Sequence, residues 1–138
     1  MFPEIAPIHV NRIKFLVSEK FYDGLAFWKG GATIMVQTGC PNNDGTGNTG
    51  YTMQTEYSKM PTDKGMVMAA RNDPKDVNSE DSQFWILLEN IPRLVGQYTV
   101  WGEVVEGMNC IDKIKTGGLL GEPLKNPDKI ISLSLIDY

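Results

Sequence analysis

The sequence predicts a mainly β fold, a closed or nearly closed antiparallel β-barrel that is capped by two α-helices. Three observations favour this class. Most apolar segments are short, rich in β-branched or aromatic residues, and bounded by turn-forming residues. Only two segments have the longer helical period, and they lie far apart in the chain. The 138 residues contain no repeat, low-complexity linker or break in composition, so we expect a single domain over residues 1–138.

The two predicted helices differ in length. The longer covers residues 7–20, where apolar side chains recur at helical spacing at Val10, Ile13, Leu16 and Val17. Pro7 suits the first turn of a helix, and Gly24 follows soon after the last periodic residues. The shorter covers residues 107–115, with Met108, Ile111 and Ile114 at helical spacing, and two glycines follow it at positions 117 and 118.

The other predicted elements are strands. Glycine, proline, asparagine or aspartate bounds each of them, which is typical of strands joined by tight turns. In chain order the predicted strands cover residues 33–37, 66–70, 83–88, 98–105 and 130–136. Residues 51–57 also alternate between apolar and polar side chains and are a candidate for a further short strand.

Composition and charge exclude several classes of function. The net charge is −4 and acidic and basic residues are interspersed, so no nucleic-acid or anionic-membrane partner is expected. No apolar run approaches the ~20 residues that span a bilayer, and the first ten residues lack the pattern of a signal peptide. His9 is the only histidine, which argues against a zinc site or a histidine-based triad, and no cofactor is expected. Cys40 and Cys110 stand apart and are predicted to be free thiols in a reducing, cytoplasmic compartment.

Residues 45–50, GTGNTG, match the dinucleotide-binding pattern G-x-G-x-x-G. That motif binds phosphate only where a strand ends directly before it and a helix begins directly after it. Here the preceding predicted strand ends several residues earlier, and an alternating segment follows. The favoured interpretation is a glycine-rich surface loop between strands.

Several segments, taken in order, resemble those of the cyclophilins. They are FYDGLAF, MVQTG, a Gly-Thr-rich loop, GMVMAA, SEDSQFWI, YTVWGEVVEGMNCIDKI and NPDKIISL. The resemblance covers the chain from about Phe2 onward and is closest to compact bacterial members. Its most specific residues are Gly102, Val105, Glu106, Gly107 and Met108. It implies an eight-stranded antiparallel barrel with a helix closing each end, in agreement with the class predicted from periodicity.

The resemblance also implies a departure in the fold. Residues 1–7, MFPEIAP, resemble the turn that follows the second strand of the family and leads into its first helix. The chain is therefore expected to lack the first strand and most of the second, which would leave unpaired edges beside residues 130–138. We expect either an open barrel plugged by side chains or self-association through these edges.

Cyclophilins catalyse rotation about X–Pro peptide bonds, so the resemblance implies proline-containing peptides or proteins as partners. The family's catalytic arginine follows a histidine in the motif FHR, and here Lys29 and Trp28 occupy these positions. An ammonium cannot make the planar two-pronged contact of a guanidinium. Gly30 and Gly31 follow where the family has β-branched residues, and they are expected to loosen the strand beside the cation.

Other positions of the family's substrate groove are partly retained. Residues that match its motifs are Met35, Gln37, Ala70, Gln83 and Leu94. Tyr98 matches a variant of its histidine, and Arg71 follows Ala70 as in many bacterial members. The substituted positions are Ile34 for the pocket phenylalanine, Trp85 for the second phenylalanine of SQFF, and Arg93 for the apolar or aromatic residue before Leu94. The tryptophan that contacts cyclosporin-type drugs corresponds to Arg93, which predicts poor binding of such ligands.

Three functions remain open at this point. The first is a cyclophilin-type isomerase whose catalysis is weak or lost because Lys29 replaces the arginine. The second is a non-catalytic, chaperone-like module that binds proline peptides or proteins in the same groove. The third, a nucleotide-binding protein, rests on GTGNTG alone.

The roles of three single residues also remain open. Lys29 is either a solvated lysine or a contact for the peptide, and Trp28 and Trp85 either pack in the core or touch the ligand.

Overall fold

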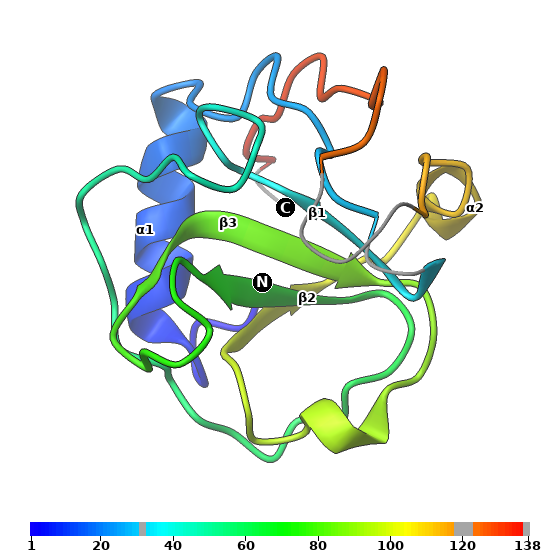
Figure 1. Ribbon diagram of the computed structural model, residues 1–138. Coiled ribbons are helices and arrows are strands. Elements are labelled where there is room, and N and C mark those ends of the chain that lie inside the picture. The colour runs from blue at the N-terminus through cyan, green and yellow to red at the C-terminus, as the bar shows by residue number, and fades with distance from the viewer. Residues whose placement is uncertain (31–32, 118–122, 137–138) are drawn as a thin grey trace.

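A computed structural model describes residues 1–30, 33–117 and 123–136, and its centre is an antiparallel sheet (Figure 1). The strand order is β1-β3-β2-β4. The four strands are β1 (Met35–Thr38), β2 (Met66–Arg71), β3 (Glu80–Leu87) and β4 (Val100–Glu103). The mainly β, cyclophilin-like class is confirmed, and these described strands form an open sheet. The predicted strands at residues 33–37, 66–70, 83–88 and 98–105 each overlap one of the four.

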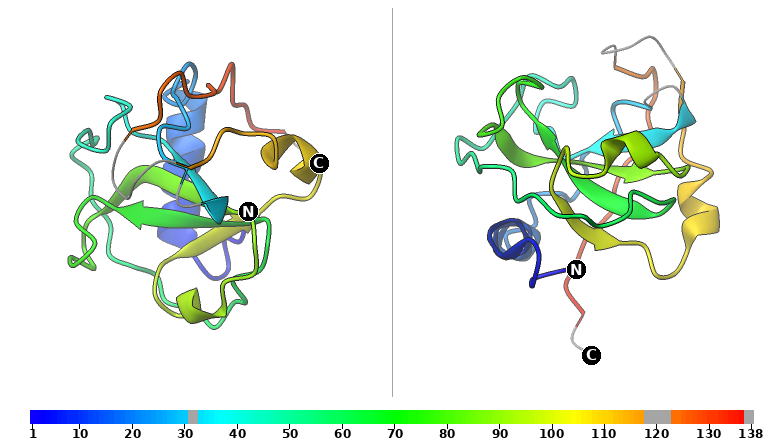
Figure 2. Two further views of the ribbon diagram at one scale, coloured as in Figure 1. Left: turned by 45° about the vertical axis from the view of Figure 1, so that its right-hand side comes forward. Right: turned by 90° about the horizontal axis from the view of Figure 1, so that it is seen from below.

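The helices lie apart on different sides of the sheet (Figures 1 and 2). They are α1 (Pro7–Ser18), the short α2 (Met108–Ile111) and a 3₁₀-helix, η2 (Pro92–Leu94). Proline at the start of α1 removes one of the N–H groups that a helix start leaves without a partner. Two further N–H groups at the start of the helix, those of Ile8 and His9, donate hydrogen bonds to the side-chain carboxylate of Glu56 at 3.2 and 2.8 Å. Within the described ranges, no helix is long and apolar enough to cross a membrane.

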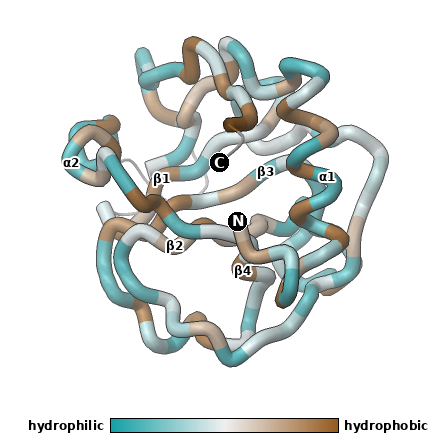
Figure 3. Tube along the Cα trace, turned by 180° about the vertical axis from the view of Figure 1, so that it is seen from behind, coloured by the Kyte–Doolittle hydropathy of each residue, from teal (hydrophilic) through white to brown (hydrophobic). Residues whose placement is uncertain are grey.

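The sheet has two faces with different partners. Val36, Phe84 and Ile86 point to the α1 side, where they form the main core with residues of the helix. The residues that α1 contributes to this core are the ones predicted from helical spacing, namely Val10, Ile13, Leu16 and Val17. The helix alternates between hydrophobic and hydrophilic segments, as a one-sided contact requires (Figure 3). Successive residues of a strand point to opposite faces, so the neighbours of the core residues line the face turned away from α1.

Two of the predicted strands are absent. Residues 130–136 form no regular strand, because their backbone finds few partners: Ile130 exchanges hydrogen bonds with Gly24 and Leu25, and Leu133 donates to Asp23. Ile131 is 92% exposed, as expected of a segment without a neighbouring strand. Residues 51–57 pair with β3 only through an isolated bridge from Met53 to Glu80. An alternating pattern predicts extended backbone, but a strand also needs a regular ladder of partners.

The GTGNTG segment lies in a loop, since β1 ends at Thr38 and the next regular element, β2, begins only at Met66. Its first glycine is needed for packing. A Cβ atom at Gly45 would lie 2.6 Å from the ring of Trp28, and the backbone there has a φ of +89°. The glycine therefore lets the loop lie against the Trp28 ring.

Candidate functional site

The sheet face turned away from α1 brings together most of the predicted substrate-binding residues. The register places Met35 opposite Leu87 and Gln37 opposite Trp85, and opposed residues project from the same face. Ile34, Leu94 and Tyr98 belong to the same apolar cluster as Met35 and Trp85. We call this surface the site face, and define it by Ile34, Met35, Gln37, Gln83, Trp85, Leu94 and Tyr98.

Two glutamines of the site face are held by a buried hydrogen-bond network. The indole N–H of Trp28 and the side-chain amide N–H of Gln37 both donate to Oε1 of Gln83, each at 3.0 Å. An indole nitrogen can only donate, so the atom of Gln83 that faces it has to be the oxygen. The other polar atoms, Nε2 of Gln83 and Oε1 of Gln37, form no hydrogen bond within the described residues. One donor and one acceptor are therefore left beside an apolar surface.

Lys29 lies next to this network and projects from the same face. It forms an isolated antiparallel bridge with Gln37, whose backbone N–H donates to the Lys29 carbonyl at 2.8 Å. The side chain is half-buried, and Nζ lies 5.9 Å from the ring centre of Trp28, at the limit of a cation–π contact. In the described part of the chain, no carboxylate lies within 4.0 Å of Nζ. The sequence-predicted cation is thus placed beside Gln37 without an ionic partner.

Gly30 allows two backbone segments to pack closely beside Lys29. It is buried and bridges to Gly117, and a Cβ atom at this position would lie 2.4 Å from Cα of Thr116. The missing side chain permits a close approach of two backbones, which stabilises the position of the segment beside Lys29. Lys29 and Gly30 form isolated bridges and belong to no regular strand, so the loosened strand stays a prediction, and Gly31 lies outside the described residues.

The three substituted aromatic positions separate into two environments. Trp28 is only 4% exposed and packs with Ala26 and Cys40, so it belongs to the core as well as to the hydrogen-bond network. Trp85 is half-buried on the site face, where its ring packs edge to face on Tyr98 at 4.8 Å. Its indole N–H is enclosed without an acceptor in the described residues. Ile34 stands in the same apolar cluster and presents no ring.

Arg71 is part of the supporting framework. Its guanidinium stacks on Tyr98 at 4.3 Å and donates to the Gln97 carbonyl at 2.6 Å, to Oγ1 of Thr55 at 3.0 Å and to the Pro74 carbonyl at 3.3 Å. The terminal N–H groups of Arg71 are therefore used in hydrogen bonds within the protein. Arg71 would affect a ligand indirectly, by holding the Tyr98 ring in position. Of the other predicted residues, Ala70 is buried in β2 and Arg93 is exposed on η2.

Behind Arg71 lies a buried charge cluster that sequence reasoning missed. Glu80 is fully buried, and its carboxylate accepts hydrogen bonds from Thr99 at 2.6 Å and Thr55 at 3.0 Å. The two nearest cationic groups are Nε2 of His9 at 3.0 Å and Nε of Arg71 at 3.7 Å. In the sequence, the acidic pair Glu80 and Asp81 comes just before the predicted strand 83–88, and in the structure both residues belong to β3. A buried carboxylate such as Glu80 needs hydrogen-bond donors or cationic partners.

His9 connects this cluster to Glu56. Its Nδ1 lies 2.6 Å from the Glu56 carboxylate, while Nε2 faces Glu80. Burial by itself lowers the pKa of His9, but the two carboxylates outweigh it, so the pKa is raised above its ordinary value. The only histidine of the chain therefore links α1 to Glu56 and to Glu80 of β3.

Comparison with known proteins places the chain in a family. Residues 1–135 match the family described as cyclophilin type peptidyl-prolyl cis-trans isomerase/CLD. A probable peptidyl-prolyl cis-trans isomerase of Brucella abortus is 42% identical over 96% of this chain and 74% of its own length. Peptidyl-prolyl cis-trans isomerase B of Bacillus subtilis is 35% identical over 88% of this chain and 85% of its own length.

A solved structure shares the fold. The cyclophilin type peptidyl-prolyl cis-trans isomerase of Cryptosporidium parvum, crystallised in the presence of the dipeptide Ala-Pro, has a TM-score of 0.85. It is 21% identical, and the match covers 99% of this chain and 90% of that one. From the matched motifs, the sheet and these relatives, the chain belongs to the cyclophilin-type peptidyl-prolyl cis-trans isomerase family.

Proposed function

We propose that this protein binds proline-containing peptides or proteins across the site face and catalyses X–Pro isomerisation at a reduced rate. The observation that carries the proposal is the buried network of Trp28, Gln37 and Gln83 beside an apolar cluster. Family membership supports it, since the relatives bear the name of the isomerase and one was crystallised in the presence of Ala-Pro.

The chemistry suits a site without a nucleophile. Rotation about a peptide bond has an uncatalysed barrier of about 18–20 kcal/mol, and no covalent bond is broken. The protein has to hold the peptide and stabilise the charge that the amide nitrogen and carbonyl carry when resonance is lost. Nε2 of Gln83 and Nζ of Lys29 supply donors, and Oε1 of Gln37 supplies an acceptor. The apolar cluster around Met35 and Trp85 supplies the contact for the proline ring.

Lys29 is the reason to expect a reduced rate. Its ammonium is a point charge on a flexible stem, whereas a guanidinium would donate through a fixed fork. Loss of one well-placed transition-state donor typically lowers the rate by a factor of about 10²–10³. The network of Trp28 with the glutamines holds Gln83 and Gln37 in place without help from Lys29. Binding and catalysis are therefore expected to separate, with catalysis the more affected.

The test compares the wild type with Lys29→Arg on a proline tetrapeptide that carries a cis-sensitive reporter. The expected result is a weak acceleration by the wild type and a clearly faster one by Lys29→Arg. Lys14→Arg is the matched control, because Lys14 is exposed on α1, away from the site face, and should leave the rate unchanged. No acceleration by either protein would contradict the proposal of an isomerase.

A non-catalytic binding module is the alternative, and the packing of Trp85 against Tyr98 favours it. A tryptophan fixed in this way leaves less room for a proline ring than a phenylalanine would. This alternative stands if turnover is absent in both proteins while a proline peptide still shifts the NMR signals of Gln37 and Gln83. If those signals do not move, neither function holds.

We further infer that the protein associates with itself through the open part of the sheet and works in a reducing, cytoplasmic compartment. Ile131 and Ile136 are 92% and 72% exposed on a segment that has no regular partner strand in the described chain, which supports the first inference. The sedimentation coefficient should then depend on protein concentration, and a monomer at high concentration would contradict self-association.

The inference of a reducing compartment rests on the cysteines, because Cys40 and Cys110 are free thiols. Recovery of the protein from an oxidising compartment on cell fractionation would refute that inference.

A further inference from the structure

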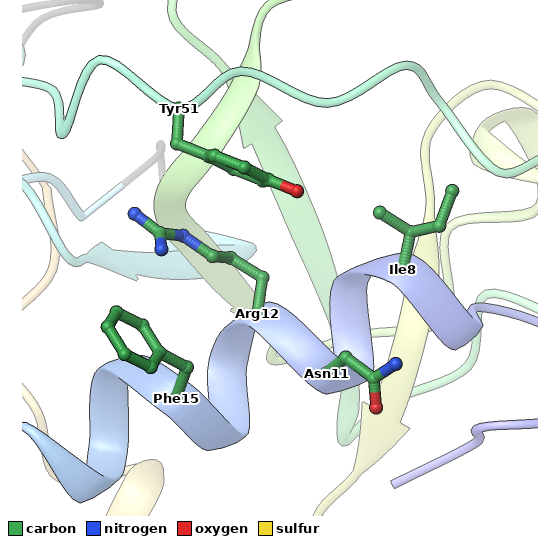
Figure 4. Close-up of a pocket in the computed structure, with 5 residues that line it drawn as sticks. All are labelled: Ile8, Asn11, Arg12, Phe15 and Tyr51. Carbon is green, nitrogen blue, oxygen red and sulfur yellow. The ribbon is translucent and has the colours of Figure 1, made fainter.

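Helix α1 carries a second stripe of residues that does not face the sheet. Ile8 and Phe15 are 53% and 51% exposed, and Tyr51, which is 52% exposed, reaches over the helix from the loop that follows GTGNTG (Figure 4). Together with Asn11 and Arg12 they line a hollow of about 360 Å³. We call this surface the α1 hollow. Large apolar side chains exposed together, rather than singly, mark surfaces that bind partners.

Arg12 is held in a fixed position at the centre of the α1 hollow. Its guanidinium carbon lies 4.4 Å from the ring centre of Tyr51 and 5.1 Å from that of Phe15, and the side chain lies between the two rings (Figure 4). Nη2 donates to Oγ1 of Thr49 at 3.2 Å, and the backbone N–H of Thr49 donates in turn to Asp81 at 2.9 Å. Little side-chain freedom remains to be lost when a ligand binds.

The charge of Arg12 has no ionic partner in the described part of the chain, where no carboxylate lies within 4.0 Å of it. Its Nε–H is enclosed and finds no acceptor among residues 1–30, 33–117 and 123–136. A guanidinium offers five N–H donors, and within the described residues only Nη2 makes a hydrogen bond. The nearest carboxylate in this hydrogen-bond chain, Asp81, is reached only through Thr49. The site therefore combines a positioned cation, without a direct ionic contact in the described residues, with apolar side chains on both sides.

We propose that the α1 hollow is a docking site for a segment of a partner protein that carries an acidic residue next to an apolar one. The acidic side chain would pair with Arg12, and the apolar side chain would lie between Ile8 and Tyr51. Charge complementarity favours a carboxylate, because charge-assisted bonds from arginine to carboxylate are among the stronger polar contacts. Arginine and tyrosine are also over-represented among residues that dominate binding at interfaces. The site shares no residue with the site face, so this proposal does not rest on the proposed function.

The test uses two blocked peptides without proline, Gly-Leu-Glu-Leu-Gly and Gly-Leu-Gln-Leu-Gly, titrated into ¹⁵N-labelled full chain. The glutamate peptide should shift the amide signals of Asn11, Arg12, Thr49 and Tyr51. It should bind at least about tenfold more tightly than its glutamine counterpart, which corresponds to a single charge-assisted contact. Added salt should weaken its binding, since the pair is near the surface. Equal binding of the two peptides, or shifts confined to other regions, would overturn the proposal.

Two variants and a control locate the effect. Arg12→Gln removes the charge, and Tyr51→Ala removes an exposed ring without disturbing the core; both should lower the affinity for the glutamate peptide about tenfold or more. Lys14→Gln makes the same charge change on the same helix, where Lys14 is exposed and points away from Arg12, and should have little effect. An equal loss in Lys14→Gln would indicate unspecific attraction. Binding of acetate as tight as that of the peptide would indicate an anion site, and either result refutes the docking site.

Discussion

Replacing Glu80 with glutamine is expected to destabilise the fold more than any single carboxyl-to-amide change at the surface. Glu80 is fully buried and faces two cationic side chains, with His9 at 3.0 Å and Arg71 at 3.7 Å. Glutamine preserves the volume and one acceptor oxygen, but it removes the negative charge. Two cationic groups then remain in the interior with less compensation.

The magnitude follows from this geometry. Loss of one partner from a buried ion pair costs about 3–5 kcal/mol of the free energy of unfolding. His9 keeps Glu56 at 2.6 Å, and Arg71 keeps its three hydrogen bonds, so the lower end, about 3 kcal/mol, is expected. With a urea slope of about 1–3 kcal/mol per M, the unfolding midpoint should fall by roughly 1–3 M.

Urea unfolding at pH 6, followed by tryptophan fluorescence, measures this change. The matched control is Asp112→Asn, which breaks the surface pair with Lys64 at 3.0 Å, where both side chains are more than two-fifths exposed. That change should cost less than about 1 kcal/mol. If Glu80→Gln loses no more stability than Asp112→Asn, the buried cluster is not the stabilising unit described above. A second check is Glu80→Gln combined with His9→Gln, whose effects should be clearly non-additive.

Three further predictions concern other parts of the molecule. The pKa of His9 is raised above its ordinary value of 6.5, so its stabilisation is fully present below about pH 6.5 and is lost as the pH rises through the folded-state pKa. The urea midpoint of the wild type should fall over that window and that of His9→Gln should not; parallel curves would contradict this. Gly30→Ala should cost about 1–3 kcal/mol, because the new Cβ would lie 2.4 Å from Cα of Thr116, and an unchanged melting temperature would exclude this packing. Cyclosporin should bind poorly to the wild type and better to Arg93→Trp in a tryptophan-quenching titration, whereas submicromolar affinity of the wild type would show that Arg93 is no obstacle.

The parts of the fold that sequence could predict are those with a local signal. The stripe from Val10 to Val17 is periodic in itself, and β1, β2 and β3 are short apolar runs bounded by turn residues, so α1 and these strands were found within a few residues. Residues 130–136 have the same local pattern but lack a regular partner strand in the described chain. Strand pairing depends on residues far away in sequence, and a periodic pattern contains no information about them.

In the candidate site, the positions of residues were predictable from motifs, whereas their hydrogen-bond partners were not. Motif matching placed Gln37, Gln83 and Trp85 on one surface, and the register of the sheet brings them there. It could not show that Trp28 turns inward to donate to Gln83, or that Arg71 is enclosed by carbonyl and hydroxyl acceptors. These contacts are set by loops, whose conformations are not periodic. Motif matching therefore predicted which residues share a surface, and the structure shows their hydrogen-bond partners.

Successive side chains of β3 point alternately to α1 and to the site face, which decides which residues of this strand can be substituted without changing the core. Phe84 and Ile86 are fixed by the core against α1, while Gln83 and Trp85 face the opposite side. Packing against α1 therefore constrains alternate residues of this short strand, while the residues between them are constrained by contacts on the site face. A library that randomises only Trp85, the half-buried residue of this second set, would alter the site face while leaving the core against α1 unchanged.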